Sequence, residues 1–560
     1  MDSIRASLPE NTEAARLYVE GLEKLRAFDA LAAKDLLSRA VAFEPNHALA
    51  HSALAAAWTD LGYEENAKME SKKAFDLSET LSRQDRLWVE AHYYEALREW
   101  DKVIEIYRSL FTFFPDNLDY GLRLATIQAA ARKGQDAMST LAALRKLPTP
   151  SRDDPRIDLA EAAAAESLGD FRQVLVNANN AAAKAERQHS LFVLAQACRQ
   201  QGWALRNLGD TRTALASMER AKQIYETEGD RGSMARTLNH IALLANDKGD
   251  SDAAISTYQQ SLAISQEIGD KRGAAATYNN LALARWQQPG RLSAARQMFE
   301  QLIVTNQEIG DEVGVALAQY NLGLVLFDLG DLSTAISAQE SALRIFRQID
   351  RKSSIALVEG FLGLMQMHRA NFPVAHAELE NSLAVRTKLG EKAGIATSQL
   401  FLGIVAGEEM QWRNAEALAR KAAEEFGAEK KPEFEAYAEA LLAHAEFNQG
   451  QREQANIAVA KAQELAAKVG DPHVRCFVGM SSGQILAGMG KSEEALATFQ
   501  RTLDLATAAG LFPYQLEARL GLGQTRRRTR ELNAAHAILA PLEKEAMSKG
   551  YVLIARKAAR

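Results

Sequence analysis

The feature that most constrains the fold of this chain is a turn that returns about every 20 residues. Gly-Asp or a close variant marks these turns: Gly209-Asp210, Gly229-Asp230, Gly249-Asp250, Gly269-Asp270, Gly310-Asp311, Gly330-Asp331, Gly390-Glu391, Gly450-Gln451, Gly470-Asp471 and Gly490-Lys491. The intervals carry apolar residues at i, i+3, i+4 and i+7, which predicts amphipathic helices. Glycine adopts the left-handed conformation that ends a helix, and aspartate caps the next one. The predicted unit is helix, turn, helix, turn.

A second pattern, with a period of 40 residues, fixes how these helices pair. From Gly209 the turns within pairs fall at residues 209, 249, 290, 330, 370, 410, 450, 490 and 530, with one extra residue near Gln287-Gln288-Pro289. Five residues after each turn stands an alanine: Ala214, Ala254, Ala295, Ala335, Ala375, Ala415, Ala455, Ala495 and Ala535. Seven residues before it the residue is also small: Gly202, Ala242, Gly323, Gly363, Gly403, Ala443, Gly483 and Gly523, with Ala282 shifted by the insertion. Small residues on facing helices let the helix axes approach closely.

Composition agrees with a repeated helical unit. A globular chain of 560 residues is expected to form about three to five domains joined by polar linkers. No such linkers occur, and 12 prolines with 7% aromatic residues disfavour sandwiches, barrels and disorder. The sequence therefore predicts an all-α fold, a right-handed α-solenoid of about fourteen helix-turn-helix pairs.

The spacing also suggests how the array is organised. Residues 1–147 have turns 34 to 37 residues apart, at Phe28-Asp29, Gly62, Glu99-Trp100 and Gly134, and the next turn follows at Gly169. We expect a joint and an irregular pair over 148–188, the 40-residue array over 189–550 and a capping tail over 551–560. Prolines and acidic residues in segment 147–155 fit either a joint between two subarrays or one long loop in a continuous solenoid.

The small residue of the first helix and the alanine of the second resemble the tetratricopeptide repeat, and the 40-residue spacing resembles its long-helix subtype. Several strings are similar to the C-terminal repeat region of bacterial serine/threonine kinases and winged-helix regulators: Ala15-Arg-Leu-Tyr-Val-Glu-Gly-Leu22, Phe114-Pro-Asp-Asn-Leu-Asp-Tyr-Gly-Leu-Arg-Leu124, Asp154-Pro-Arg-Ile-Asp-Leu-Ala-Glu161 and Leu553-Ile-Ala-Arg-Lys-Ala558. The resemblance implies repeats that sense or recruit. The kinase motifs themselves are absent from the sequence.

Charge and cysteine content bear on partners and location. The formal net charge is −6, so nucleic acid is not an expected partner. No signal peptide and no run of about 18 apolar residues occurs, so we expect no membrane insertion. Cys198 and Cys476 predict neither a disulfide framework nor a zinc site. No cofactor or metal is expected. We expect a cytoplasmic location, and the alternative is that the chain is the extracytoplasmic part of a membrane-anchored parent protein.

Three local patterns carry a chemical interpretation that the context disfavours. Gly479-Met-Ser-Ser-Gly483 matches a nucleophile elbow, but it lies within a predicted helix and Ser481 is expected to face the groove. His47 and His51 have zinc-ligand spacing without a third ligand, so surface or interface histidines are favoured. A basic cluster could bind phosphate or an acidic partner, but a solvated face of the last repeats is favoured. Its residues are Arg526-Arg527-Arg528, Arg530, Arg556, Lys557 and Arg560.

The concave side of a solenoid is lined by the first helix of each pair, and its exposed positions follow from the packing register. These candidate groove residues are Arg199, Gln200, Trp203, Arg206, Asn239, His240, Asn246, Asn279, Asn280, Trp286, Tyr320, Asn321 and Phe327. Recurring asparagines offer a donor and an acceptor to an extended peptide backbone, or they hydrogen-bond between adjacent helices and bind nothing. In later repeats the equivalent positions are apolar: Phe361, Leu364, Met367, Phe401 and Ile404. Such a stretch either binds an amphipathic helix or is packed by the narrowing superhelix itself.

The sequence favours a non-enzymatic scaffold that binds a peptide or protein segment in this groove. The alternative is a detached sensory or regulatory module of a bacterial signalling kinase or transcription regulator.

Overall fold

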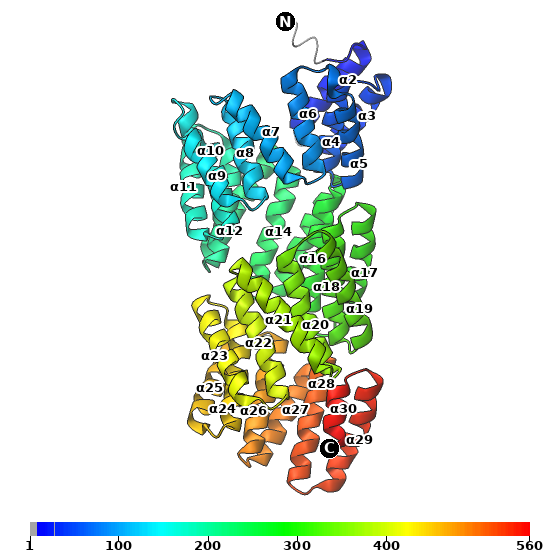
Figure 1. Cartoon of the computed structure of the whole chain (residues 1–560), viewed down its shortest axis with the longest axis vertical. Helices are drawn as coiled ribbons and strands as arrows, with labels where there is room; N and C mark the ends of the chain where they lie inside the picture. The colour runs from blue at the N-terminus through cyan, green and yellow to red at the C-terminus, as the bar shows by residue number, and fades with distance from the viewer. Residues whose placement is uncertain (1–7, 27–28) are drawn as a thin grey trace. The chain divides into compact units, whose positions relative to one another are not determined.

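The computed structural model describes residues 8–26 and 29–560, and over these ranges the chain is all-helical, with no strand. The described residues form twenty-nine α-helices and two short 3-10 turns. Consecutive helices run antiparallel and form fourteen pairs followed by the single helix α30 (Figure 1). The predicted helical solenoid of about fourteen pairs is therefore confirmed. Phe28 of the first predicted turn lies outside the described residues.

The helices have the following bounds: α2 Thr12–Arg26, α3 Ala30–Phe43, α4 Ala48–Asp60, α5 Glu64–Asp76, α6 Arg83–Ala96, α7 Trp100–Phe113, α8 Leu118–Ala130, α9 Gly134–Leu144, α10 Pro155–Ser167, α11 Phe171–Arg187, α12 Leu191–Asn207, α13 Thr211–Glu228, α14 Arg231–Asp247, α15 Ser251–Glu267, α16 Lys271–Trp286, α17 Leu292–Glu308, α18 Glu312–Asp328, α19 Leu332–Gln348, α20 Lys352–His368, α21 Phe372–Leu389, α22 Lys392–Glu408, α23 Trp412–Ala428, α24 Pro432–Asn448, α25 Arg452–Val469, α26 Pro472–Gly488, α27 Ser492–Ala509, α28 Phe512–Arg528, α29 Leu532–Ser548 and α30 Val552–Ala559. The 3-10 turns are η1 Ser78–Thr80 and η2 Ser151–Asp153.

The chain divides into two compact units. The N-terminal unit comprises residues 1–281 and 305–311, and the C-terminal unit comprises residues 282–304 and 312–560. The segment 148–188, where the sequence suggests a joint, falls inside the N-terminal unit. The sequence-based limits at 147, 188 and 550 stay predictions.

The 40-residue pattern has a direct structural counterpart. All nine turn positions from 209 to 530 have a left-handed backbone with φ between 59° and 86°. Glycine adopts this conformation without strain, whereas Ala370, Met410 and Arg530 carry a side chain there. The nine alanines that follow the turns are all buried, none more than 2% exposed. Turn and packing register were thus both readable from the sequence.

The two helices of a pair differ in burial. In α24, nine residues are buried, whereas in its partner α25 only four are: Ala455, Ala458, Ala462 and Ala466. Helix α24 also packs against α22 and α26, the corresponding helices of the neighbouring pairs. The first helix of each pair therefore lies in an inner layer, and its remaining exposed positions face the concave side.

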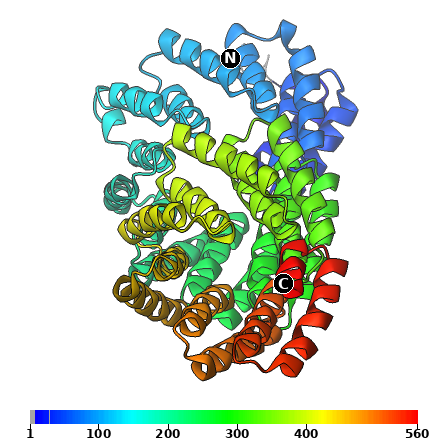
Figure 2. The ribbon, with the colours of Figure 1, turned by 60° about the horizontal axis from the view of Figure 1, so that its bottom comes forward.

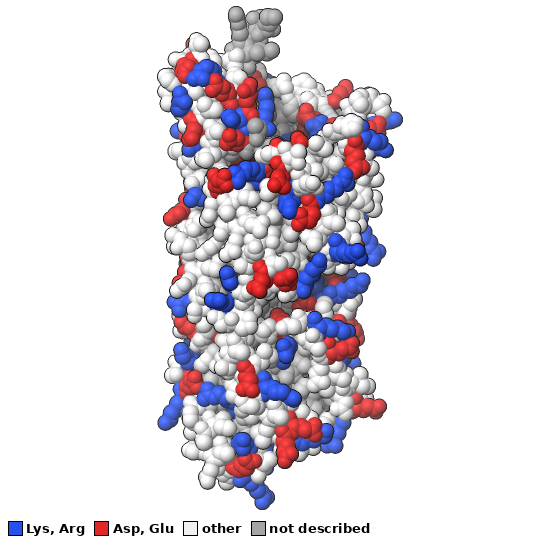
Figure 3. Space-filling model, turned by 180° about the vertical axis from the view of Figure 1, so that it is seen from behind, with Lys and Arg blue, Asp and Glu red and all other residues white. Residues whose placement is uncertain are grey.

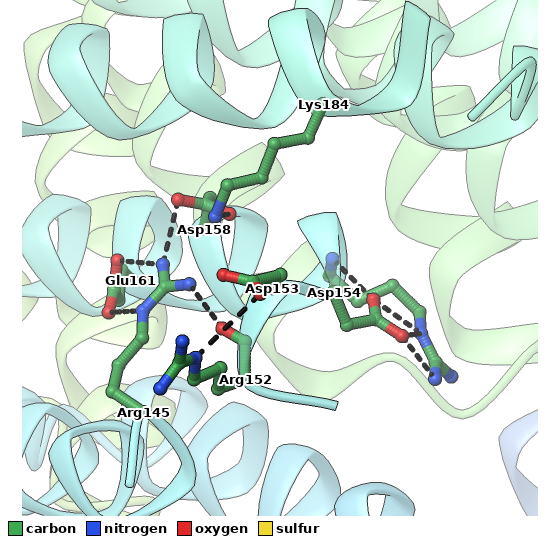
Figure 4. Close-up of polar contacts among 8 residues, drawn as sticks. Arg145, Arg152, Asp153, Asp154, Asp158, Glu161 and Lys184 are labelled. Carbon is green, nitrogen blue, oxygen red and sulfur yellow. Dashed lines mark hydrogen bonds and ion pairs between the residues drawn. The ribbon is translucent and has the colours of Figure 1, made fainter. Parts of the chain in front are cut away.

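The proline-rich segment before α10 is held by charged side chains (Figure 4). Arg145, just after α9, forms ion pairs with Asp158 at 2.7 Å and with Glu161 at 2.8 Å. It also donates a hydrogen bond to the carbonyl of Arg152 at 3.0 Å. Lys184 of α11 reaches the other oxygen of Asp158 at 2.7 Å. Asp158 is 2% exposed, so its charge depends on these two partners. The network ties α9, α10 and α11 together across the segment.

Replacing Arg145 with methionine is expected to lower the free energy of unfolding by about 2 kcal/mol, because two carboxylates lose a charged hydrogen-bond donor while the aliphatic stem is kept. Urea denaturation of the full chain measures this. The matched control is Arg152→Met, because the side chain of Arg152 is exposed and lies 3.7 Å from Asp153. An Arg145 variant as stable as the control would show that the network is dispensable.

Helix α30 closes the C-terminal unit. It packs against α28, α29 and α20, while α28 contacts α18. The red C-terminal helices consequently lie against green helices far earlier in the sequence (Figure 2). Tyr551, just before α30, is fully buried and donates its hydroxyl to the carbonyl of Phe327 at 2.9 Å. Part of the concave side of this unit is thus covered by its own C-terminal helix.

Candidate functional site

Nine of the thirteen predicted groove residues belong to the N-terminal unit and lie on the inner helices α12, α14 and α16. All nine are half-buried, neither fully exposed nor part of the core. We call them the inner-helix strip: Arg199, Gln200, Trp203, Arg206, Asn239, His240, Asn246, Asn279 and Asn280. Their common position follows from the 40-residue register, which places equivalent side chains of successive pairs next to each other.

Hydrogen bonds connect neighbouring inner helices along the strip. Arg206 pairs with Asp247 of α14 at 2.6 Å. Asn280 donates from Nδ2 to Oδ1 of Asn239 at 3.1 Å, and Asn279 donates to Asn280 at 3.4 Å. The asparagine pair thus makes the inter-helix bond that the sequence left open as one of two alternatives. The bond fixes the orientation of both amides, which retain further donor and acceptor capacity.

Trp203 and His240 form the aromatic centre of the strip. Their rings stack with centroids 5.2 Å apart, and the guanidinium of Arg206 lies 5.3 Å from the Trp203 ring centroid. Burial, together with the positive charges of Arg199, Arg206 and Arg236, lowers the pKa of His240 to about 4. The imidazole is therefore neutral at physiological pH and offers one acceptor nitrogen.

Two buried polar atoms of the strip lack a hydrogen-bond partner among the described residues. They are Nδ1 of His240 and Oε1 of Gln200. The amide nitrogen of Gln200 donates to the carbonyl of Leu159 at 3.3 Å, which orients the free oxygen. Buried polar atoms without partners cost free energy, so these positions favour a ligand that supplies hydrogen-bond donors.

The charges near the strip are predominantly positive. Of the three arginines around His240, Arg206 is neutralised by Asp247 and Arg236 interacts electrostatically with Asp60 and Asp270. Arg199 has no ion pair with any carboxylate in the described part of the chain. This local field contrasts with the face in Figure 3, where side chains of both signs alternate. Arg236 is not among the groove residues predicted from the sequence.

The other four predicted groove residues belong to the C-terminal unit and make internal contacts there. Trp286 donates from Nε1 to Asp328 at 2.7 Å. Tyr320 and Asn321 are buried, and Phe327 packs against His368 and Tyr551. The apolar stretch behaves similarly: Phe361 and Phe401 lie edge to face at 5.3 Å within one hydrophobic cluster. In this unit the concave positions are therefore largely taken up by the unit's own packing.

The three disfavoured patterns have structural explanations. His51 is buried, hydrogen-bonded to Glu70 at 2.6 Å and to the carbonyl of Pro45, while His47 caps α4. Ser481 was expected to face the groove, but this prediction is wrong. Its buried hydroxyl donates to the carbonyl of Ala440 at 2.6 Å. Over residues 8–26 and 29–560, no group of three or more potential ligands is arranged to hold a metal ion.

The basic cluster is divided rather than forming one patch. Arg526 pairs with Glu531 at 2.5 Å, and Lys557 forms an ion pair with Glu408 of α22. The two cysteines are buried and unpaired, and burial raises the pKa of both thiols. Neither feature forms a reactive centre.

Comparison with known proteins agrees with the helical register. Sequence models of the tetratricopeptide repeat match residues 233–303 and 316–349. These two segments of the chain are tetratricopeptide repeats. No curated protein matches the chain significantly. In the described part of this repeat protein, no helix is long and apolar enough to cross a membrane. The resemblance to bacterial kinases and winged-helix regulators stays a prediction.

Several solved structures of helical proteins are similar to parts of the chain. A Rap protein complexed with Competence and Sporulation Factor is 12% identical, with a TM-score of 0.48, over 63% of this chain and 98% of its own. BtubC from P. vanneervenii is 24% identical, with a TM-score of 0.33, over 40% and 92% respectively. Yeast Tom70 is 15% identical, with a TM-score of 0.37, over 86% and 97%. Repeats of this type form interaction scaffolds with extended concave binding surfaces.

Proposed function

We propose that the inner-helix strip of the N-terminal unit binds an extended peptide segment of a partner protein, with an acidic side chain of that peptide at Arg199. The observation that carries this proposal is the pair of unpartnered polar atoms, Nδ1 of His240 and Oε1 of Gln200, on a half-buried surface. An extended peptide presents backbone N–H groups at regular intervals and can supply donors to both atoms.

The side chains around these atoms support the same ligand. Trp203 offers a large apolar contact beside them, held in place by the stack with His240 and by Arg206. Tryptophan is enriched among residues that dominate binding energy at interfaces. Arg199 forms no ion pair with a described carboxylate, and its positive charge favours a carboxylate of the ligand.

A displayed library of random twelve-residue peptides, selected on the full chain, tests this function. We expect enrichment of peptides with acidic residues and micromolar affinity in fluorescence polarisation. Trp203→Ala should weaken binding of the best peptide at least about tenfold, because it removes the central apolar contact. Asn280→Ala should weaken it less, since the amide is shared with Asn239.

The matched control is Gln223→Ala, because Gln223 is exposed on the outer helix α13. This variant should bind as the unaltered chain does, and circular dichroism confirms that all variants stay folded. Selected peptides whose affinity is insensitive to Trp203→Ala would place the binding surface elsewhere and refute the proposal.

A further inference from the structure

The C-terminal unit encloses a chamber on its concave side, separate from the inner-helix strip. Its volume is about 250 Å³, and its walls come from α20, α22, α24, α26, α27, α28 and α30. Asn448 and Arg528 line the chamber and are exposed, so the chamber communicates with solvent. Pockets for small molecules typically measure about 300–1,000 Å³. With a volume just below this range, the chamber suits a small ligand and is too small for an extended peptide.

Helix α30 forms part of the wall of the chamber. Leu553, Ile554 and Lys557 of this helix form one wall. Lys557 makes an ion pair with Glu408 on the opposite side, and this pair neutralises both charges. Helix α30 thus supplies apolar surface and leaves no unpaired cation in the interior.

One carboxylate in the chamber is left without a partner. Glu517 of α28 lines the cavity and has no hydrogen bond or ion pair to another described residue. His368, across the chamber on α20, is 8% exposed and its Nδ1 also lacks a hydrogen-bond partner in the described chain. A carboxylate and a neutral imidazole thus line the same chamber.

The protonation states follow from the surroundings. Burial, aided by the nearby charge of Glu408 and opposed by Lys557, raises the pKa of Glu517 to about 7. Burial lowers the pKa of His368 and of His444 to about 4. Both histidines are neutral at physiological pH and can accept a hydrogen bond. A ligand cation is therefore not opposed by imidazolium charge.

The remaining groups near Glu517 do not supply a positive charge at depth. Cys476 of α26, Tyr514 of α28 and Tyr551 before α30 are neutral, because burial raises the pKa of each. Arg528 is exposed at the mouth. The apolar part of the wall includes Met480 and Phe447, and an aromatic face attracts cations.

We propose that this chamber binds a small organic cation, a primary amine on a short aliphatic chain, with Glu517 as its counter-ion and His368 as a hydrogen-bond acceptor. The ammonium group provides donors for both unpartnered atoms, and the aliphatic chain lies against the apolar wall. This inference does not depend on peptide binding at the inner-helix strip, because it concerns other residues in the other unit.

The test uses the full chain with n-butylamine as the probe, and with 1-butanol and butyrate as uncharged and anionic analogues. Isothermal titration calorimetry at pH 8 should detect butylammonium and neither analogue. Binding should weaken about tenfold at pH 6, because most of the protein then carries a protonated Glu517 that must first lose its proton. Absence of butylammonium binding at millimolar concentration, or equal binding of 1-butanol, would overturn the proposal.

Two variants locate the site. Glu517→Gln keeps the shape of the protonated side chain and should abolish binding, whereas Glu493→Gln on the exposed start of α27 should not change it. Lys557→Met removes a positive charge that lowers the pKa of Glu517, so binding should begin at a higher pH, a shift that a damaged fold cannot produce. Unaltered affinity in Glu517→Gln would refute the assignment.

Discussion

Replacing Asp328 with asparagine is expected to lower the free energy of unfolding of the chain by about 3 kcal/mol, because it breaks a buried charge pair. Asp328 is 3% exposed and accepts hydrogen bonds from Trp286 at 2.7 Å and from His473 at 2.9 Å. His473 is partly buried and its other nitrogen faces Asp471 at 3.3 Å. The variant leaves the imidazolium with one carboxylate only. Urea denaturation near pH 6 measures the loss.

The effect of the Asp328 substitution should depend on pH in a defined direction. Burial by itself lowers the pKa of His473, but Asp328 and Asp471 outweigh it and raise that pKa to about 10. The pKa of His473 is higher in the folded chain than its value of about 6.5 in the unfolded chain, so the charged imidazole stabilises the fold. This stabilisation is complete below a pH of about 6.5 and is lost as pH rises toward 10. The difference between the unaltered chain and Asp328→Asn should therefore shrink from pH 6 to pH 10. A difference that stays constant would contradict the charge-pair account.

A matched control for this experiment is Asp504→Asn. Asp504 is exposed on α27 and accepts a hydrogen bond only from Gln500 of the same helix among the contacts recorded for it. Its replacement should change stability by less than about 0.5 kcal/mol at every pH. This control separates a specific pair from a general change in net charge.

Replacing Phe499 with alanine is expected to lower the free energy of unfolding by about 3–5 kcal/mol, since it removes a buried ring and leaves a cavity between α26 and α28. Phe499 is 1% exposed, and a Cβ added at Gly483 or Gly521 would lie 2.5 Å or 2.6 Å from its ring. The two glycines of α26 and α28 thus form the hole that the ring fills. Thermal and chemical denaturation measure the cost.

The complementary change tests the same packing from the other side. Gly483→Ala introduces the clashing Cβ and should destabilise by about 1–3 kcal/mol, because the Phe499 ring must leave its packed position between α26 and α28. Gly490→Ala provides no such test, because Gly490 has a φ of +79° and would suffer backbone strain instead. A stable Phe499→Ala variant, losing less than about 1 kcal/mol, would show that the small-residue pattern does not define the core.

Much of the fold could be read from the sequence because its determinants recur. The left-handed turn at Gly209 and the buried Ala214 return with the same spacing in every later pair, and repetition distinguishes them from chance. The shorter helices of the first pairs followed from shorter turn spacing: α4 has 13 residues, whereas α12 has 17. Packing within and between adjacent pairs is local, so local patterns predict it.

The interactions that close the C-terminal unit were not predictable in this way. His473 meets Asp328 across 145 residues, and Lys557 meets Glu408 across 149. No repeating sequence pattern marks such pairs, because their contact depends on how far each repeat is rotated relative to the one before it, summed over several repeats. Glu517 shows the same limit: in the sequence it is one glutamate among many, and only the fold isolates it from a partner. For the inner-helix strip, by contrast, the register alone placed nine residues on a common half-buried surface.

The contact between Tyr551 and Phe327 has a consequence for how this array can evolve. Solenoids commonly lengthen by in-frame duplication of a repeat, since each unit touches only its neighbours. Here the two residues are separated by 224 positions and meet only if the intervening pairs add up to the right rotation. One additional 40-residue unit between them would carry Tyr551 past its acceptor. The number of repeats in this unit is consequently under the same selection as the residues of its core.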